Sequence, residues 1–211
     1  QAKLISIGTS CSYDPQLPLT ENNYLEGTPI NSLYTYAMCK RMLQIGQIAL
    51  SKQFGLSYLT VVPSTLYGSG YHNDGRQMHF IFDLVKKIML GKFKNQKVIL
   101  WGDGFQKREI VFIDDFIDSM IFLEKKCSND LINVCAGKEF TIRNFAEIIC
   151  RIIDFDPKKI IYDTNRYVGA RSKNPNIKKL LKYIPSYLDD TTNLESGLKQ
   201  VIEWFKTQEN F

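Results

Sequence analysis

A tyrosine and a lysine four residues apart are the first candidates for chemistry in this sequence. Tyr36 and Lys40 lie in the stretch 32–40, which reads SLYTYAMCK. If this stretch is helical, the phenol and the ammonium lie on one face, one turn apart. A nearby cation favours the phenolate, so such a tyrosine can hand a proton to a carbonyl oxygen while a hydride reaches the carbon. The spacing is also common on amphipathic helices, so the neighbouring residues must support the interpretation.

Two apolar segments that end in small polar or turn residues flank this pair. Residues 5–13 read ISIGTSCSY, and residues 58–68 read YLTVVPSTLYG. A strand, a helix and a second strand in this order predict a parallel βαβ unit. In such a unit the polar side chains gather where the strands end, which is where ligands bind in open α/β sheets.

Together with four further motifs, these segments resemble a known family. The resemblance is to the extended short-chain dehydrogenase/reductases that act on nucleotide sugars (the NAD-dependent epimerase/dehydratase family), and within it to the GDP-L-fucose synthase group. It covers nearly all of the chain. The four further motifs are VILWGDG at 98–104, KREIVFIDD at 107–115, LINVCAG at 131–137 and GARSK at 169–173.

The resemblance implies an α/β fold: an incomplete Rossmann-like, doubly wound parallel sheet that lacks its first strands, with a smaller, discontinuous α/β substrate-binding domain. Residues 1–68 would form the C-terminal part of the dinucleotide-binding domain and carry the Tyr/Lys pair. Residues 69–211 would mainly bind the sugar nucleotide, with the segment around 110–136 returning to the Rossmann domain. The family's Gly-x-x-Gly-x-x-Gly turn does not occur in the sequence, so we expect this chain to be part of a longer protein.

The implied activity is 3,5-epimerisation followed by NADPH-dependent 4-reduction of a nucleotide 4-keto-6-deoxy sugar. The 4-keto group acidifies the C3 and C5 protons, and inversion requires one group to remove a proton and another to return it. Cys11, two residues after Thr9, and His79, eleven after Gly68, match the family's thiol and imidazole. The simpler interpretations are a small buried filler for Cys11 and a half-buried helix residue or cap for His79.

The reduction would use Tyr36 as the proton donor with Lys40 in support. A hydroxyl would hold the ketone, and Thr9 is favoured over Ser10 for this role. Lys40 would also reach the nicotinamide ribose. The residues expected to contact NADPH are Tyr36, Lys40, Pro63, Leu66 and His79.

Four further residues match positions that bind the substrate in the family. Arg108 and Lys87 would face the nucleotide diphosphate, where guanidinium is the better bidentate partner and lysine acts as a point charge. Trp101 and Lys173 would line the sugar-nucleotide site. Lys87 departs from the arginine more usual in the family, and a GDP-heptose or another 4-keto sugar nucleotide stays open as the substrate.

Two other functions stay open. A nucleotide-sugar 4-epimerase or 4,6-dehydratase would use Tyr36 and Lys40 without Cys11 and His79. A non-catalytic truncated chain or pseudoenzyme would bind a sugar nucleotide or a partner subunit, and the missing glycine fingerprint favours this for the chain by itself. Deuterium exchange at C3 and C5 distinguishes the first alternative, and cofactor binding distinguishes the second.

Composition narrows the classes of partner. The net charge of +5 over 211 residues suits an anionic nucleotide, but the basic residues form no long block that would suggest a nucleic acid. The five cysteines are scattered without a Cys-x-x-Cys, which argues against zinc or a disulfide framework and for a reducing cytoplasm. We expect a homodimer without metal or membrane contact.

Hydrophobic periodicity and turn residues predict the elements that must position these side chains. We expect Asp114 and Asp115 to cap a helix that reaches Leu123, and Thr141 to cap a helix that reaches Ile153. The other expected helices are 33–54, about 76–91 and 194–205, and the expected strands are 3–8, 57–62, 98–101, 110–112, 131–135 and 158–162.

Overall fold

A computed structural model describes residues 2–166 and 168–208 of the chain. The fold is α/β, and the chain divides into two compact units. The first unit comprises Gln1–Leu66, Glu109–Lys138 and Asn174–Thr191, and the second comprises Tyr67–Arg108, Glu139–Lys173 and Thr192–Phe211. Each unit is therefore built from three separate stretches of sequence.

A three-stranded parallel sheet forms the centre of the first unit. Its order is β1 (Lys3–Ile7), β2 (Ser57–Pro63) and β7 (Asp130–Val134). β2 pairs in parallel with both neighbours, with Ile5 opposite Leu59 and Val61 opposite Ile132. β2 is buried along almost its whole length, as expected for a central strand of a parallel sheet. The strand–helix–strand order expected around the Tyr/Lys pair is present.

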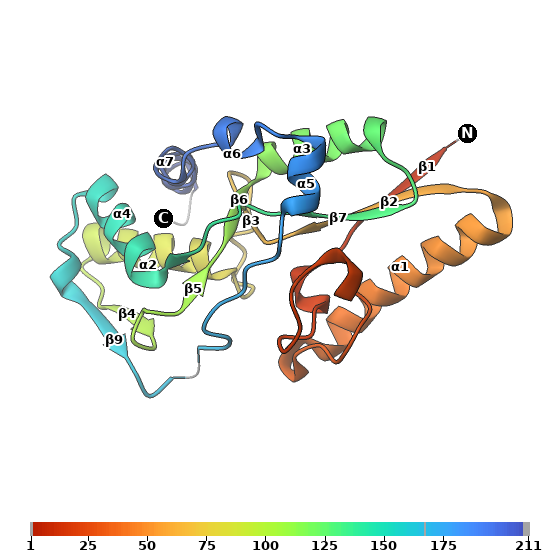
Figure 1. The fold of residues 1–211 in the computed structure, drawn as a ribbon. Coiled ribbons are helices and arrows are strands. Elements are labelled where there is room, and N and C mark those ends of the chain that lie inside the picture. Colours follow the sequence, from red (N-terminus) through yellow and green to blue (C-terminus); the bar gives the residue numbers. More distant parts are fainter. Residues whose placement is uncertain (1, 167, 209–211) are drawn as a thin grey trace. The chain divides into compact units, whose positions relative to one another are not determined.

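Helices cover both faces of this sheet (Figure 1). α1 (Tyr34–Phe54) lies on one face, and α3 (Ile113–Lys126) and α5 (Lys178–Tyr183) lie on the other. The main apolar core lies between the sheet and α3 and α5. Its buried members include Leu59, Val61, Phe116, Leu123, Ile132, Val134 and Leu180. The remaining elements of the unit are α6 (Tyr187–Asp190), the short strands β3 (Thr65–Tyr67) and β6 (Ile110–Phe112), which pair with each other, and three 3-10 turns, Ser10–Ser12, Glu21–Asn23 and Asn31–Leu33.

The polarity of α1 is inverted relative to an ordinary surface helix. Its buried stripe is Ala37, Arg41, Gln44 and Gln47. Its exposed side chains include five large apolar ones, and two of them, Met42 and Phe54, are each 59% exposed. An amphipathic surface helix normally buries its apolar stripe and exposes its polar one. The exposed apolar residues are Met42, Leu43, Ile45, Leu50 and Phe54.

A buried polar cluster joins α1 to the sheet beneath it. The Ser6 hydroxyl on β1 donates to the Gln47 side-chain carbonyl (2.8 Å) and lies 3.0 Å from the Thr60 hydroxyl on β2. The Thr60 hydroxyl also lies within hydrogen-bond distance of the side-chain carbonyls of Gln44 and Gln47. All four side chains are at most 6% exposed. Buried polar groups are tolerated when they are hydrogen-bonded in this way.

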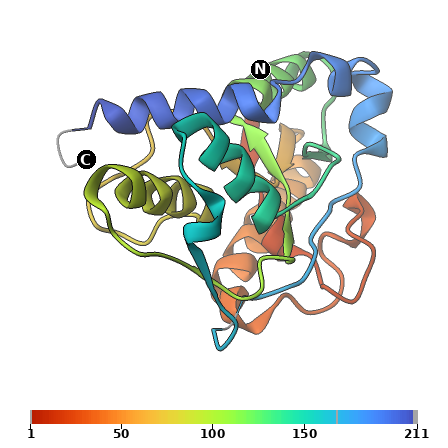
Figure 2. The ribbon, with the colours of Figure 1, turned by 90° about the vertical axis from the view of Figure 1, so that its left-hand side faces the viewer.

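The second unit packs three helices together beside a two-stranded parallel sheet. α2 (Phe80–Lys94), α4 (Ile142–Ile153) and α7 (Leu194–Lys206) contact one another, and they are visible in Figure 2 as the olive, teal and dark blue helices. β4 (Val98–Trp101) pairs with β9 (Ile160–Asp163), which follows the 3-10 turn Pro157–Lys159, and β5 (Lys107–Arg108) pairs with β8 (Phe140–Thr141). Thr141 caps α4 through the Asn144 backbone N–H, as its sequence predicts.

Asp114 and Asp115 are not the caps expected of them. α3 begins at Ile113, so both aspartates lie inside its first turn, and Phe112 occupies the cap position without a side-chain bond. Carboxylates in a first helical turn are still favourable because they face the positive end of the helix dipole.

Among the described residues, no helix has the length and apolar character needed to cross a bilayer.

Candidate active site

Tyr36 and Lys40 lie in the first two turns of α1, on the same face. The Lys40 ammonium is 5.9 Å from the centre of the Tyr36 ring. Tyr36 is 48% exposed. The Lys40 ammonium also donates a 2.9 Å hydrogen bond to the Ile7 carbonyl at the end of β1. This bond fixes the Tyr/Lys pair relative to the segment that follows β1.

That segment is a tight turn that carries Thr9, Ser10 and Cys11. The turn is a 3-10 helix from Ser10 to Ser12, and the Thr9 hydroxyl caps it by accepting from the Cys11 backbone N–H (3.2 Å). Thr9 and Ser10 are buried, whereas Cys11 is half-buried. The polar residues therefore gather at the carboxyl end of β1, the edge at which open α/β sheets bind ligands.

Gly8 lets the backbone approach its neighbours closely at this point. Its N–H donates to the Val61 carbonyl (2.8 Å). A Cβ atom on residue 8 would lie 2.8 Å from the Tyr24 hydroxyl oxygen and 2.9 Å from a Val62 methyl carbon. Real Cβ atoms do not approach other atoms so closely, so a side chain at Gly8 would displace the turn that holds Thr9 and Cys11.

Tyr24 supports this turn, although its place in the sequence did not mark it as a candidate. Its hydroxyl accepts from the Thr9 backbone N–H (3.3 Å), and only 1% of its side chain is exposed. Its ring packs edge-on against Tyr13, whose hydroxyl donates to the Asn133 side-chain carbonyl (2.6 Å). Burial raises the pKa of Tyr24. The clue available in the sequence was a pair of tyrosines in a loop rich in Pro, Asn and Asp.

Pro63 and Leu66, expected to contact the cofactor, lie in the same unit. Pro63 is the last residue of β2 and is paired with Val134. Leu66 lies in β3, and its side chain packs against the apolar core. Pro63 therefore lies at the carboxyl end of the central strand, while the Leu66 side chain contacts the protein interior.

His79 lies in the second unit, at the N-cap position of α2. Its side chain makes no capping bond, and its backbone N–H donates to the Tyr71 hydroxyl (3.1 Å). Tyr71 in turn stacks on Phe82, with ring centres 3.8 Å apart. Partial burial, with a smaller contribution from His72, lowers the pKa of His79 from its ordinary value of 6.5. The imidazole is thus mainly neutral at pH 7, the form that can accept a proton.

The four residues expected to bind substrate also belong to the second unit. Three of them form hydrogen bonds or an ion pair with other groups of the protein. The Arg108 guanidinium donates to the carbonyls of Lys107, Val168 and Ala170 (2.7 to 2.8 Å), using three of its five N–H donors. Lys87 forms an ion pair with Asp83 (2.7 Å). The Lys173 backbone N–H donates to Glu139 (2.6 Å).

Trp101 is the most exposed of the four. Its side chain is 55% exposed at the end of β4, and the Arg166 guanidinium lies 5.6 Å from the ring centre. The same guanidinium also lies 3.5 Å from a carboxylate oxygen of Asp163. The exposed Trp101 ring therefore offers a planar stacking surface beside an ion pair.

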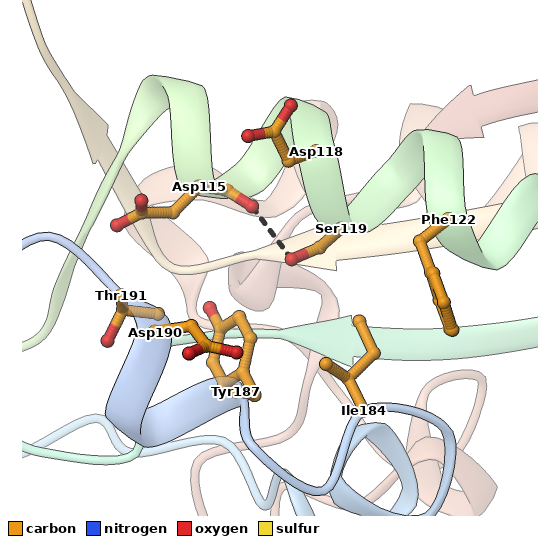
Figure 3. Close-up of a pocket in the computed structure, with 8 residues that line it drawn as sticks. All are labelled: Asp115, Asp118, Ser119, Phe122, Ile184, Tyr187, Asp190 and Thr191. Carbon is orange, nitrogen blue, oxygen red and sulfur yellow. Dashed lines mark hydrogen bonds between the residues drawn. The ribbon is translucent and has the colours of Figure 1, made fainter.

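A separate hollow in the first unit is acidic (Figure 3). It has a volume of about 240 Å³ and lies between α3 and the segment that contains α6. Three carboxylates line it, so it would repel a nucleotide diphosphate, and it contains none of the expected site residues. Its lining residues are Asp115, Asp118, Ser119, Phe122, Ile184, Tyr187, Asp190 and Thr191.

No group of three or more His, Cys, Asp or Glu in the described part of the chain is arranged to hold a metal ion.

Known proteins resemble this chain in sequence and in fold. It is 30% identical to a GDP-L-fucose synthase from Sinorhizobium fredii, over 96% of this chain and 65% of that protein, and 29% identical to a probable GDP-L-fucose synthase from Oryza sativa. The chain thus spans a little less than two-thirds of these relatives' length.

Solved structures share the fold. A GDP-L-fucose synthetase from Naegleria fowleri matches with a TM-score of 0.88 at 22% identity, over 99% of this chain and 66% of that one. A GDP-6-OMe-4-keto-L-xylo-heptose reductase from C. jejuni matches with a TM-score of 0.84 at 21% identity, over 98% of this chain and 71% of that one. Residues 1–135 match the model of the NAD dependent epimerase/dehydratase family. The chain belongs to that family.

Proposed function

We propose that this chain provides the proton-transfer residues of an NADPH-dependent enzyme that epimerises C3 and C5 and reduces C4 of a nucleotide 4-keto-6-deoxy sugar. The observation that carries the proposal is the hydrogen bond from Lys40 to the Ile7 carbonyl. It joins the helix that bears Tyr36 to the turn that bears Thr9 and Cys11. The GDP-L-fucose synthases among its relatives support the substrate class.

In the reductive step, Tyr36 donates its phenolic proton to O4 of the sugar. The Lys40 ammonium beside the Tyr36 ring stabilises the phenolate that remains, and the Thr9 hydroxyl orients the ketone. When bound, NADPH supplies the hydride that reaches C4. The exposed Tyr36 and the half-buried Lys40, with Pro63 at the end of β2, fit the nicotinamide ribose end of this cofactor.

In the epimerising step, Cys11 and His79 act as the acid and the base. The 4-keto group acidifies the C–H bonds at C3 and C5, so one residue removes a proton to leave an enolate and the other returns a proton to the opposite face. A largely neutral His79 suits the base, and the half-buried Cys11 thiol suits the donor. A 4-epimerase or 4,6-dehydratase would not need this pair, which favours the epimerase/reductase.

We propose that the first unit contributes to the dinucleotide domain and that the second binds the sugar nucleotide. In the second unit, Arg108, Lys87, Trp101 and Lys173 would hold the nucleotide, and the overall charge of +5 favours an anionic ligand. The fit at the other end of the cofactor is incomplete, because the sequence has no glycine-rich turn to bind the pyrophosphate. A non-catalytic sugar-nucleotide binder is the alternative function.

We further propose a homodimer in a reducing cytoplasm. Support for the dimer comes from the apolar side chains that α1 exposes, which a second copy of the chain would cover. None of the five cysteines, all of which lie in the described part of the chain, forms a disulfide, in keeping with a reducing compartment.

The test uses an extended chain, in which the glycine-rich dinucleotide-binding segment of a family member is fused ahead of Gln1. With GDP-4-keto-6-deoxy-mannose, the extended chain should oxidise NADPH, followed as loss of absorbance. Tyr36→Phe should lower the rate about 100-fold or more, because it removes the proton donor. Tyr34→Phe, a matched change two residues earlier on the same helix, should leave the rate unchanged. Equal rates in the two variants would exclude the assignment of Tyr36.

A further inference from the structure

The side chain of Arg41, the residue after Lys40 on α1, is fully occupied by backbone carbonyls of the 12–27 loop. Its Nε and one Nη2 N–H donate to the Ser12 carbonyl, and the other Nη2 N–H donates to Glu26. Its two Nη1 N–H groups donate to Leu25 and Gly27. These five bonds are 2.5 to 3.2 Å long. A guanidinium has five N–H donors, so every donor of Arg41 is used.

Because all five N–H donors are used, Arg41 has no donor left to bind the substrate directly. Its side chain is only 5% exposed, and a phosphate would have to displace one of the four carbonyls that accept these bonds. Burial lowers the pKa of Arg41, which reflects the cost of taking its charge out of water. Carbonyl dipoles on several sides compensate for part of that cost, as in other buried charges that are fully hydrogen-bonded.

The four acceptor carbonyls lie at the two ends of the loop, so Arg41 closes it. Asp14 closes it a second time, because its carboxylate accepts from the Gln16 and Thr28 backbone N–H groups (2.8 Å each). Gly27 makes this closure possible: its φ is +61°, and a Cβ there would lie 2.2 Å from an Asp14 carboxylate oxygen. The loop therefore has one well-defined closed form.

The near end of the loop is directly attached to the Cys11 turn. Ser12, which accepts two bonds from Arg41, is the last residue of that turn and follows Cys11. The Ser12 hydroxyl also donates to the Ala37 carbonyl on α1 (3.3 Å). A displacement of Ser12 would therefore move Cys11 relative to the helix that bears Tyr36.

We propose that Arg41 is a positioning residue that holds the Thr9–Cys11 turn against α1. Through this contact it fixes where the Cys11 thiol lies relative to Tyr36 and Lys40. The positioning stands on the contacts alone, whereas its consequence for epimerisation rests on the proposed function. Lysine cannot replace it, because one ammonium has three donors on a single nitrogen and cannot reach both ends of the loop.

The experiment measures alkylation of Cys11 by iodoacetamide in the chain itself. Cys39, the exposed thiol, is changed to Ser in all samples, and the buried Cys150 serves as the internal reference. In Arg41→Lys, Cys11 should react about fivefold or more faster, because the loop opens locally, while Cys150 stays protected. Ser119→Ala, at a buried polar position of α3 that does not contact the loop, should leave the Cys11 rate unchanged.

An unchanged Cys11 rate in Arg41→Lys would overturn the proposal, as would an equal increase in Ser119→Ala. If Arg41→Lys does not fold, Gly27→Ala replaces it, since it leaves Arg41 in place but strains the closed loop. A Cys11 rate that stays at the parent value in Gly27→Ala would also overturn the proposal.

In the extended chain, Arg41→Lys should slow deuterium exchange at C3 and C5 of the sugar more than it slows NADPH oxidation. If the parent extended chain shows neither reaction, the proposed function fails, and the alkylation result still decides the positioning role. If exchange and oxidation slow by the same factor, the specific link to Cys11 is rejected.

Discussion

The Lys40 ammonium donates a hydrogen bond to the Ile7 carbonyl, two residues before Thr9. Lys40, which lies beside the Tyr36 ring on α1, is therefore also hydrogen-bonded to the last residue of β1. Lys40 thus acts with Arg41 to set the spacing between the phenol of Tyr36 and the hydroxyl and thiol of the following turn. Changes at Lys40 should affect this geometry as well as the charge next to Tyr36.

Lys40→Met in the extended chain should lower the rate of NADPH oxidation about 100-fold or more, because it removes both the cation beside Tyr36 and the bond to Ile7. Lys52→Met is the matched control, since Lys52 lies exposed near the end of the same helix. The rates are compared at saturating substrate. A loss of less than threefold in Lys40→Met would be incompatible with the role assigned to Lys40.

Cys11→Ser should separate the two chemical steps. The loss of the thiol should suppress wash-in of solvent deuterium at C3 and C5 far more than it suppresses oxidation of NADPH, because hydride transfer depends on Tyr36. Mass spectrometry of the recovered sugar nucleotide measures the wash-in. Cys39→Ser, at the exposed cysteine of α1, serves as the control. Normal wash-in in Cys11→Ser would remove Cys11 from the mechanism.

His79 should titrate below pH 6.5 in the folded chain, because burial disfavours the imidazolium. The sequence has two histidines, so His72→Gln leaves a single imidazole signal to follow by NMR. That variant should also move the His79 pKa slightly upward, since His72 contributes to the lowering. A midpoint at or above 6.5 in the unsubstituted chain would contradict the burial seen at α2.

The same shift has a consequence for stability. A histidine whose pKa is lower in the folded than in the unfolded state binds protons preferentially in the unfolded state. Its contribution to stability is therefore present above pH 6.5 and is lost as the pH falls through that value towards the folded pKa. Urea unfolding at pH 7.5 and pH 5.5, with His79→Gln as the reference, measures this difference.

Tyr24→Phe should destabilise the first unit by about 1–3 kcal/mol, because it leaves the buried Thr9 N–H without its acceptor. Tyr34→Phe, on an exposed side chain, should change the free energy of unfolding by less than about 0.5 kcal/mol. Urea unfolding followed by circular dichroism compares the two variants. Equal stabilities would show that Tyr24 does not support the turn.

The chain without the added segment should bind NADPH only weakly, since no glycine-rich turn provides backbone N–H donors for the pyrophosphate. Titration calorimetry compares it with the extended chain, which should bind more tightly. Micromolar binding by the shorter chain would mean that other residues hold the pyrophosphate.

Local patterns were enough to predict the elements that position the candidate site. The apolar runs and the residues that follow them predicted β1, α1 and β2, and Thr141 predicted the start of α4. The short helices α5 and α6 were not predicted, because a few residues carry too little periodicity. α2 begins at Phe80, after the expected start near residue 76.

The support around the candidate site could not be read from the sequence. Tyr24 contacts Thr9 across fifteen residues and Arg41 contacts Ser12 across twenty-nine, so neither pair has a local pattern. Asp114 and Asp115 show the opposite error, since a typical capping residue type was present but the helix begins at Ile113, before both of them. Residue type predicted the candidate chemistry, whereas the folded backbone determines which side chains hold it in place.

The polar cluster beneath α1 fixes the position of this helix along the sheet. An apolar interface tolerates small slides, because one methyl group packs much like another, but the Ser6, Thr60, Gln44 and Gln47 bonds are directional. Moving α1 by one residue would translate it by about 1.5 Å and rotate both glutamines by about 100° away from the sheet. The same shift would break the hydrogen bonds from Lys40 to the Ile7 carbonyl and from Arg41 to the Ser12 carbonyl. The helix therefore has a single position along the sheet. A partner that covers its outer apolar face would bind a surface whose side chains are held in one arrangement.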